Sequence, residues 1–315
     1  MKILLLGGNG FGNVHARSLA KLGYRFSVFS RKDEVLKKYR EEFGVSETYS
    51  DLNEAMLSDC DVVDIVMPHH MHCEIAVRAM EMGKHVIIEK PISTTLQEAD
   101  KMINASMKNR VKFMVAEQYY FDRSLQKAIK YVEEGKIGKV HTIIVRNQRY
   151  FDYGGWRKSE KEMGGGALID GGIHFMEAFL DIGGDYDDIK SFNYRGGNVI
   201  GGEDTTMAMF SFKSGARGLF FYSWAYRHSP KLPAYEIVGT DGSIVESTVK
   251  GNINTSFGRP VLNGSIQDVE EKDVIDMEIS GFLRAVEDDR EVPYPLANAR
   301  RNLSAVLKIY ENGNL

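Results

Sequence analysis

Two side chains in the middle of the sequence could together move a proton. Asp170 and His174 are four residues apart, just after three consecutive glycines, and this spacing places both on one face of a helix. An imidazole can take a proton from an alcohol near neutral pH, and a carboxylate beside it can orient the ring or a substrate hydroxyl. On residue type alone, the alternative is that Asp170 caps the helix and His174 is a buried structural histidine.

A lysine nearer the N-terminus could polarise the oxygen that loses this proton. Lys90 stands between Glu89 and Pro91, directly after an apolar run that predicts a central strand. Open parallel sheets bind ligands at the carboxyl ends of such strands, where an ammonium can hydrogen-bond a substrate oxygen. The alternative is that Lys90 pairs with Glu89 or is solvated at the rim of a loop.

A glycine-rich turn near the N-terminus is typical of a dinucleotide site. Residues 7–12 read GGNGFG between an apolar run and a helical pattern. Gly7 would make the tight turn and Gly12 the close packing, while the helix N-terminus would face the pyrophosphate. Asn9 stands where a glycine is usual, but Asn tolerates a left-handed backbone and Gly10 adds freedom. This context favours a cofactor site over a plain turn, with contacts at Gly7, Asn9, Gly10, Phe11 and Gly12.

The end of the second apolar run favours NADP over NAD. Proteins that bind the unphosphorylated cofactor usually place Asp or Glu here, against the adenine ribose. This chain has Ser30, Arg31 and Lys32 instead, which can donate to a 2'-phosphate and pair with it. Alternatively, the two cations begin a solvated loop and Asp33 or Glu34 reaches the ribose.

The elements that would carry these residues divide the chain into two domains. Short apolar runs alternate with helical patterns up to about residue 116, which predicts a doubly wound α/β domain with a parallel sheet. Beyond residue 140 the runs lengthen, alternate in polarity and are joined by turns, which predicts an open, mostly antiparallel sheet. We expect a Rossmann domain over residues 1–119 and an α+β substrate-binding domain over 120–315, whose last helix could pack back on the first.

Composition excludes several classes of protein. The 315 residues suggest about two domains at ~150 residues each, and a formal net charge of -4 offers no general attraction to nucleic acid or anionic lipid. No apolar run approaches the ~18 residues that span a bilayer. With only two cysteines and no targeting segment at the N-terminus, we expect a cytoplasmic protein.

Alternating aromatic residues in the second domain suggest self-association. They are Phe210, Phe212, Phe220 and Tyr222. The predicted sheet has too few helices to cover both its faces. We therefore expect a homodimer or homotetramer that buries the open face of this sheet.

The motifs, in their order and spacing, resemble the Gfo/Idh/MocA family, the group of glucose-fructose oxidoreductase and inositol dehydrogenase. The resemblance extends over nearly the whole chain. It rests on the glycine turn leading to His15, Pro68 to His72, Glu89-Lys90-Pro91, Gly154 to Arg157, the triple glycine with Asp170 and His174, Glu203 to Thr205, and Gly239 to Ser243. In that family the lysine of Glu-Lys-Pro and the aspartate and histidine of the glycine-led helix line the substrate beside the nicotinamide. The resemblance thus implies that Lys90, Asp170 and His174 are catalytic.

The resemblance also implies further contacts. Cofactor contacts would come from Pro68, His69, His72 and Glu89. Substrate contacts would come from Tyr119, Trp156 and Arg157, where Trp156 could stack on a sugar and Arg157 could hold hydroxyls or a carboxylate. The alternative for the last two is an exposed surface anchor. The chain departs from the family pattern at Asn9 and at residues 118–122, which lack the usual Arg and Pro.

A cluster of metal-ligand residue types follows the third long apolar run. It consists of His69, His70, His72 and Cys73. So tight a spacing cannot bring all four to one tetrahedral point, and relatives use this loop against the cofactor. We therefore predict no metal site.

Together these features predict an NAD(P)-dependent oxidoreductase that moves a hydride between nicotinamide C4 and a hydroxyl-bearing carbon of a sugar, cyclitol or dihydrodiol. His174 would take the hydroxyl proton, Lys90 would polarise the same oxygen, and Asp170 would orient the ring or its neighbouring hydroxyl. Two alternatives are a non-catalytic dinucleotide sensor of the same fold and a redox-neutral enzyme with tightly held cofactor.

Overall fold

The first part of the chain forms a parallel sheet, as its short apolar runs predict. The computed structural model describes residues 1–248 and 256–313. Six strands lie in the order β3-β2-β1-β4-β5-β6, and every neighbouring pair is parallel. They are β1 Ile3–Leu6, β2 Phe26–Phe29, β3 Thr48–Tyr49, β4 Val62–Ile65, β5 His85–Glu89 and β6 Phe113–Ala116. The predicted doubly wound Rossmann sheet is confirmed.

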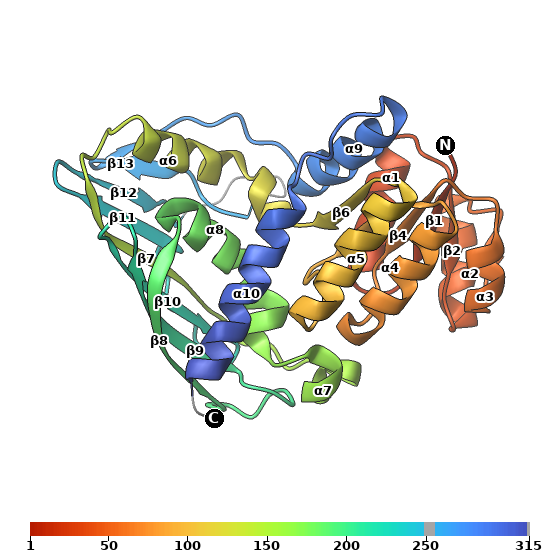
Figure 1. The fold of residues 1–315 in the computed structure, drawn as a ribbon, viewed down its shortest axis with the longest axis horizontal. Helices are drawn as coiled ribbons and strands as arrows, with labels where there is room; N and C mark the ends of the chain where they lie inside the picture. The colour runs from red at the N-terminus through yellow and green to blue at the C-terminus, as the bar shows by residue number, and fades with distance from the viewer. Residues whose placement is uncertain (249–255, 314–315) are drawn as a thin grey trace. The chain divides into compact units, whose positions relative to one another are not determined.

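Helices connect the consecutive strands of this sheet. They are α1 Phe11–Lys21, α2 Asp33–Phe43, α3 Leu52–Leu57, α4 His72–Glu81 and α5 Leu96–Asn109. From β1 to β2 the chain proceeds toward one edge of the sheet, and from β4 to β5 it proceeds toward the other edge. Right-handed crossovers therefore place α1 and α2 on the face opposite α4 and α5 (Figure 1). The carboxyl ends of β1 and β4 lie where the strand order reverses, which is the usual ligand position in such sheets.

The strands of this sheet are apolar because both faces are covered. Every residue of β1 and β4 is buried. Asp64 on β4 is a charged residue among these apolar ones, and it is only 1% exposed. A buried carboxylate needs a partner, and Asp64 finds one in the candidate site.

The end of the chain returns to this first unit. By compactness, the protein divides into Met1–Glu117 with Ile275–Arg300, and Gln118–Val274 with Arg301–Leu315. Helix α9, Val274–Glu287, joins the first unit through Asp276, which accepts a hydrogen bond from Ser18 (2.6 Å) and pairs with Lys21. Helix α10, Leu296–Asn312, begins in the first unit and continues in the second. None of the described helices is long and apolar enough to cross a membrane.

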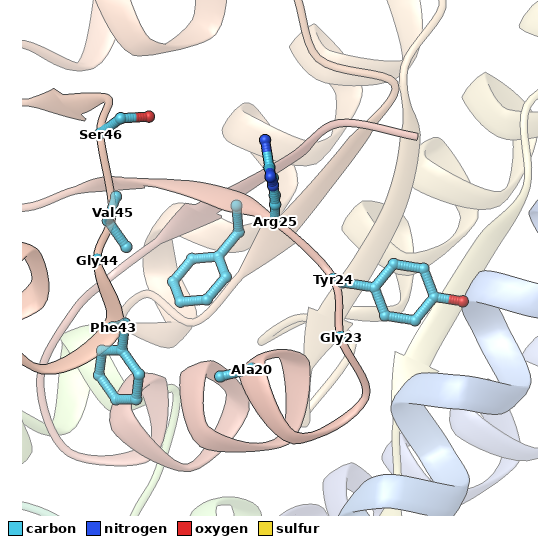
Figure 2. Close-up of a pocket in the computed structure, with 9 residues that line it drawn as sticks. Ala20, Gly23, Tyr24, Arg25, Phe43, Gly44, Val45 and Ser46 are labelled. Atoms are coloured by element: carbon cyan, nitrogen blue, oxygen red, sulfur yellow. The ribbon is translucent and has the colours of Figure 1, made fainter.

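A hollow of about 470 Å³ lies in the first unit between the ends of α1 and α2 (Figure 2). Its lining includes Phe26 and Phe43 and two glycines with positive φ, Gly23 and Gly44. Because β2 starts here, the hollow lies at the amino edge of the parallel sheet. The glycine turn after β1 lies at the carboxyl edge, so this hollow is not the predicted ligand site.

The second unit is built on an eight-stranded open sheet. The strand order is β14-β13-β12-β11-β7-β10-β9-β8, and only the β7–β10 pair is parallel. The strands are β7 Val140–Gln148, β8 Tyr186–Tyr194, β9 Thr205–Phe212, β10 Arg217–Ser223, β11 Tyr235–Gly239, β12 Ser243–Glu246, β13 Pro260–Leu262 and β14 Ser265–Ile266. The helices of this unit before α10 are α6 Arg123–Glu133, α7 Glu160–Met163 and α8 Ile173–Gly183. The predicted, mostly antiparallel sheet is confirmed.

One face of this sheet is covered by α8 (Figure 1). Phe179 of α8 packs against Phe210, Phe212 and Phe220, with ring centroids 4.9, 5.2 and 5.6 Å away. Tyr222 is buried as well. These four sheet aromatics were predicted on the open face, and that placement is wrong because alternation in a strand defines two faces without saying which one a helix covers.

The opposite face carries a different set of large apolar side chains. Its exposed members are Phe192, Tyr194, Met207, Met209 and Leu219. In the strand register Met207 stands opposite Phe192, and Met209 stands opposite Leu219. They therefore form one contiguous apolar patch across β8, β9 and β10.

Candidate active site

The glycine turn after β1 forms a cradle that side chains would fill. A Cβ on Gly7 would lie 2.1 Å from the Val66 carbonyl oxygen, and one on Gly12 would lie 1.7 Å from the Gly7 carbonyl oxygen. Gly10, at φ 55°, is the N-cap of α1, and no side chain among the described residues caps this helix. The first turn of α1 also lacks an acidic residue. An N-terminus with uncapped N–H groups and close backbone approach fits the pyrophosphate of a dinucleotide.

The segment after β2 presents positive charge. Ser30 is buried, and its Oγ accepts a hydrogen bond from the Lys32 amide at 3.2 Å. Arg31 is exposed, and it makes no ion pair within the described part of the chain. Glu34, one of the carboxylates that could have replaced the missing acid, lies 3.8 Å from the Lys32 ammonium on the surface.

The loops after β4 and β5 are tied together by a buried histidine. His72 has no exposed surface, and its ring nitrogens lie 2.9 Å from the Pro91 carbonyl oxygen and 2.8 Å from that of Met67. Burial lowers the pKa of His72, although the hydrogen bonds to these carbonyls and the negative charge of Glu89 act to raise it. The ring of His69, also buried, meets that of His72 edge-on at 5.8 Å. His72 thus aligns the Pro68 loop with the residues that follow Lys90. Lys90 itself is half-buried.

A charged network lies beneath these loops. The His15 ring, completely buried, lies with Nδ1 2.9 Å from Asp64 and Nε2 3.0 Å from Glu89. Burial opposes the charged imidazolium, but Asp64 and then Glu89 outweigh it and raise the pKa of His15 well above its usual range. His15 is therefore a cation between two carboxylates and joins α1 to β4 and β5. Glu89 bonds to His15, which gives it a structural partner beside the predicted Lys90.

Helix α9 adds a further acid to this network. Glu278 is fully buried, and neither of its carboxyl oxygens has a hydrogen-bond partner among the described residues. Burial, followed by the negative charge of Glu89, raises the pKa of Glu278 well above its usual range. Its surroundings therefore favour the neutral, protonated form of the Glu278 carboxyl. Sequence reasoning did not find this residue, because it lies 189 positions beyond Glu89 and outside every motif.

The second unit brings together most of the predicted substrate residues. The helix predicted to carry Asp170 and His174 begins instead with a π-helical turn, Leu168–Gly172, which contains Asp170, and becomes α-helical at Ile173. Tyr119 stacks on the His174 ring, with centroids 4.6 Å apart and planes 17° apart. Asp170 and His174 are 3% and 8% exposed. The wider turn places these two residues differently from the simple four-residue spacing of an α-helix.

An arginine holds the aspartate. The Arg157 guanidinium pairs with the Asp170 carboxylate and lies 4.3 Å from the Trp156 ring and 4.8 Å from the Tyr153 ring. Arg157 and Trp156 come from a 3₁₀ turn, Gly155–Lys158, before α7. Arg157 therefore reaches the predicted site, although its salt bridge is to Asp170. The predicted substrate contact of Arg157 stays a prediction.

Two residues outside the candidate set hold the start of the Asp170 helix. Glu203 accepts hydrogen bonds from the Leu168 amide and the Tyr310 hydroxyl, both at 2.9 Å, and Tyr310 accepts one from the Ile169 amide at 3.2 Å. Burial raises the pKa of Glu203 to about 7, although these hydrogen bonds oppose the rise. A Cβ on Gly166 would lie 2.0 Å from the Glu203 carbonyl oxygen, which explains the last glycine of the triple. Glu203 belonged to a recognised motif, whereas Tyr310 gave no signal in the sequence.

Family models match both parts of the chain. A family model described as "Oxidoreductase family, NAD-binding Rossmann fold" (GFO_IDH_MocA) matches residues 1–117, and a GFO/IDH/MocA C-terminal domain model matches residues 125–245. Levoglucosan dehydrogenase of Pseudarthrobacter phenanthrenivorans is 29% identical over 287 residues, covering 78% of this chain and 73% of that protein. The scyllo-inositol 2-dehydrogenase (NADP(+)) IolU of Bacillus subtilis is 29% identical over 231 residues, covering 71% and 68%.

A solved structure shares the fold throughout. An oxidoreductase from Thermotoga maritima superposes with a TM-score of 0.89 at 24% identity, over 100% of this chain and 97% of that one. At this identity the likeness concerns the fold alone.

The buried network predicts a histidine that stays charged above neutral pH. In histidine ¹⁵N NMR spectra at pH 7.5, His15 is expected as imidazolium, because its folded pKa is raised. Its contribution to stability is then complete below the unfolded value of about 6.5 and is lost as the pH rises through the folded pKa. The imidazolium signal that is missing from the spectrum of the His15→Gln variant is then the signal of His15.

His85 provides the internal control for this experiment. Its Nδ1 accepts the Lys112 amide at 2.9 Å, and burial, then the charge of Lys112, lowers the pKa of His85. The His85 ring should be neutral at the same pH. A neutral His15 ring at pH 7.5 would contradict the charged network.

Proposed function

This chain belongs to the Gfo/Idh/MocA family of oxidoreductases, and we propose that it uses NAD(P) to move a hydride to or from a hydroxyl-bearing carbon of a sugar, cyclitol or dihydrodiol. The observation that carries the proposal is the buried Asp170–His174 pair, with Tyr119 stacked on the histidine and Arg157 paired with the aspartate. The substrate class draws support from the sugar and cyclitol dehydrogenases among the relatives.

The nicotinamide supplies the hydride chemistry when the cofactor is bound, and the protein supplies orientation and proton transfer. His174 takes the hydroxyl proton during oxidation, and the Tyr119 ring stacked on it restricts the imidazole orientation. Asp170, held by Arg157, orients a neighbouring substrate hydroxyl. Lys90 donates a hydrogen bond to the reacting oxygen. The pyrophosphate would rest on the glycine turn at the start of α1.

Removal of the proton-transfer groups should stop turnover without removing the cofactor. In a screen of sugars, cyclitols and diols with both NAD and NADP, His174→Gln and Lys90→Met should each lower kcat by at least about a hundredfold. Cofactor affinity, measured by fluorescence quenching, should change by less than about threefold because neither substitution alters the glycine turn.

Two exposed residues provide matched controls for these variants. His141→Gln and Lys108→Met make the same chemical changes on the surface and should leave kcat unaltered. Full activity of both site variants would contradict the assigned roles. Bound cofactor without turnover of any compound in the screen would instead favour a sensor.

We propose NADP as the preferred cofactor. The proposal is supported by the exposed Arg31 guanidinium after β2 and by the engagement of Glu34 with Lys32. A charge-assisted hydrogen bond to the 2'-phosphate contributes roughly 1.5–3 kcal/mol.

The cofactor preference should depend on one arginine. Arg31→Ala should lower kcat/KM for NADP by about tenfold or more and leave that for NAD within about twofold. Arg290→Ala, on an exposed arginine of the same unit, should change neither. An equal loss with both cofactors would refute a 2'-phosphate contact.

We further propose that the protein forms a homodimer or homotetramer through the exposed face of β8, β9 and β10. Five large apolar side chains gather there in register, and isolated soluble proteins rarely expose so continuous a patch.

The two cysteines, Cys60 and Cys73, are not bonded to each other, which supports a proposed reducing, cytoplasmic setting.

A charge at the centre of this patch should separate the subunits. Light scattering of the native protein at about 10 μM should give the mass of two or four chains, and Met209→Asp should give one. Met107→Asp, at a methionine on α5 that is 64% exposed against 55% for Met209, should leave the native mass unchanged. A native protein with the mass of one chain would overturn the proposal.

A further inference from the structure

The second unit contains a pocket that the catalytic roles do not use. It has a volume of about 740 Å³ and lies where β7 ends and β11 begins. One wall is the chain from Arg146 to Phe151, and another is the loop 227–232 before β11. Phe175 of α8 also lines the pocket. All of these residues belong to one compact unit.

Positive charge dominates the lining of this pocket. Arg149, Arg227 and Lys231 are all exposed. Arg149 makes no hydrogen bond or ion pair through its side chain within residues 1–248 and 256–313. Arg227 is held over the Tyr150 ring, with its guanidinium carbon 4.4 Å from the centroid. Such stacking orients the guanidinium while leaving its N–H groups available for an anion.

The other charged residues of the lining are already engaged. Arg146 pairs with Glu236 and also donates to the Pro233 carbonyl oxygen at 3.0 Å. Among the described residues of the lining, Glu246 is the one carboxylate, and its two oxygens accept hydrogen bonds from backbone amides, those of Gly258 at 2.8 Å and of Ala234. The described lining therefore keeps an excess of three exposed cations, although the chain as a whole has a formal charge of -4.

The pocket adjoins the aromatic cluster around the proposed base. Phe175 follows His174 directly in the chain. The Tyr119 ring contacts both side chains, with its centroid 5.1 Å from that of Phe175 and 4.6 Å from that of His174. On the strand side, Asn147 stands opposite Tyr222 in the register, and Tyr222 lies 5.6 Å from Phe175. The cationic lining therefore lies next to the aromatic residues that contact the proposed base.

We propose that this pocket holds an oxyanion of the substrate, so that the enzyme acts on a polyol that carries a carboxylate or a phosphate ester. The inference rests on the proposed function and narrows its substrate class. Arg149 and Arg227 bind the oxyanion, and Lys231 adds positive charge at the rim. A pocket of this size suits a small anion better than an extended polyanion, which needs a long basic surface.

Matched pairs of compounds test the proposal with the full chain. D-glucose is compared with D-glucuronate and D-glucose 6-phosphate, and myo-inositol with its 1-phosphate, each for turnover with NAD and NADP and for binding by calorimetry. At least one anionic member should exceed its neutral counterpart about tenfold in affinity, and in kcat/KM where turnover occurs. The carboxylate and phosphate compounds distinguish the two sources of charge.

Charge removal at the pocket should abolish this preference. Arg149→Gln should lower the ratio of anionic to neutral affinity by about tenfold, and Arg149→Lys should restore part of it. Arg217→Gln makes the same change at the other end of the sheet, where Arg217 stands opposite Thr142, and should leave the ratio unaltered. Equal affinity within every pair, no binding of any anionic member, or an unchanged ratio in Arg149→Gln would overturn the proposal.

The two proposals fail in different ways. If an anionic compound binds in an Arg149-dependent manner and nothing is turned over, the oxidoreductase assignment fails and the oxyanion pocket remains. If neutral polyols are turned over and anionic ones gain nothing, the pocket proposal fails and the oxidoreductase assignment remains.

Discussion

The first unit depends on a buried cation held between two carboxylates. His15, Asp64 and Glu89 come from α1, β4 and β5, the three elements whose ends form the proposed cofactor site. Breaking a buried ion pair by removing one partner costs roughly 3–5 kcal/mol, because the other charge is left without compensation. The network therefore fixes the spacing between the glycine turn, the Pro68 loop and the segment around Lys90. Its cost in desolvation suggests that accurate positioning, rather than stability alone, is what it provides.

In the second unit, different groups fix the position of a proposed catalytic residue. Asp170 lies in a π-helical turn, and its position depends on Arg157 on one side and on the Glu203–Tyr310 pair at the start of the helix on the other. Gly171 packs so closely that a Cβ there would lie 2.1 Å from the Tyr222 hydroxyl. In both units, charged or polar neighbours hold the residues that are proposed to touch the cofactor or the substrate. A substitution among them would act through geometry, as the supporting residues of many binding sites do.

Local pattern predicted most of the elements, and long-range contacts account for what it missed. The bounds of β1, β2 and β6 follow directly from apolar runs, because a strand buried on both faces has to be apolar. The partners of His15 lie 49 and 74 positions away, so no local pattern could pair them. The π-helical turn was missed for a similar reason, since Tyr310, which bonds to it, and Tyr222, which packs closely against Gly171, come from distant parts of the chain. The covered face of the second sheet could not be predicted either, because strand alternation is symmetric until a helix packs on one side.

The return of residues 275–300 to the first unit has a consequence for how the protein is made. Glu278 and Asp276 belong to α9, yet they complete a unit that otherwise ends at Glu117. During synthesis the Rossmann sheet leaves the ribosome well before α9 does. The surface of the first unit beside α1 therefore stays uncovered while residues 118–274 of the second unit are translated. Nascent-chain folding, which usually proceeds from the N-terminal domain onward, should here finish the two units almost together.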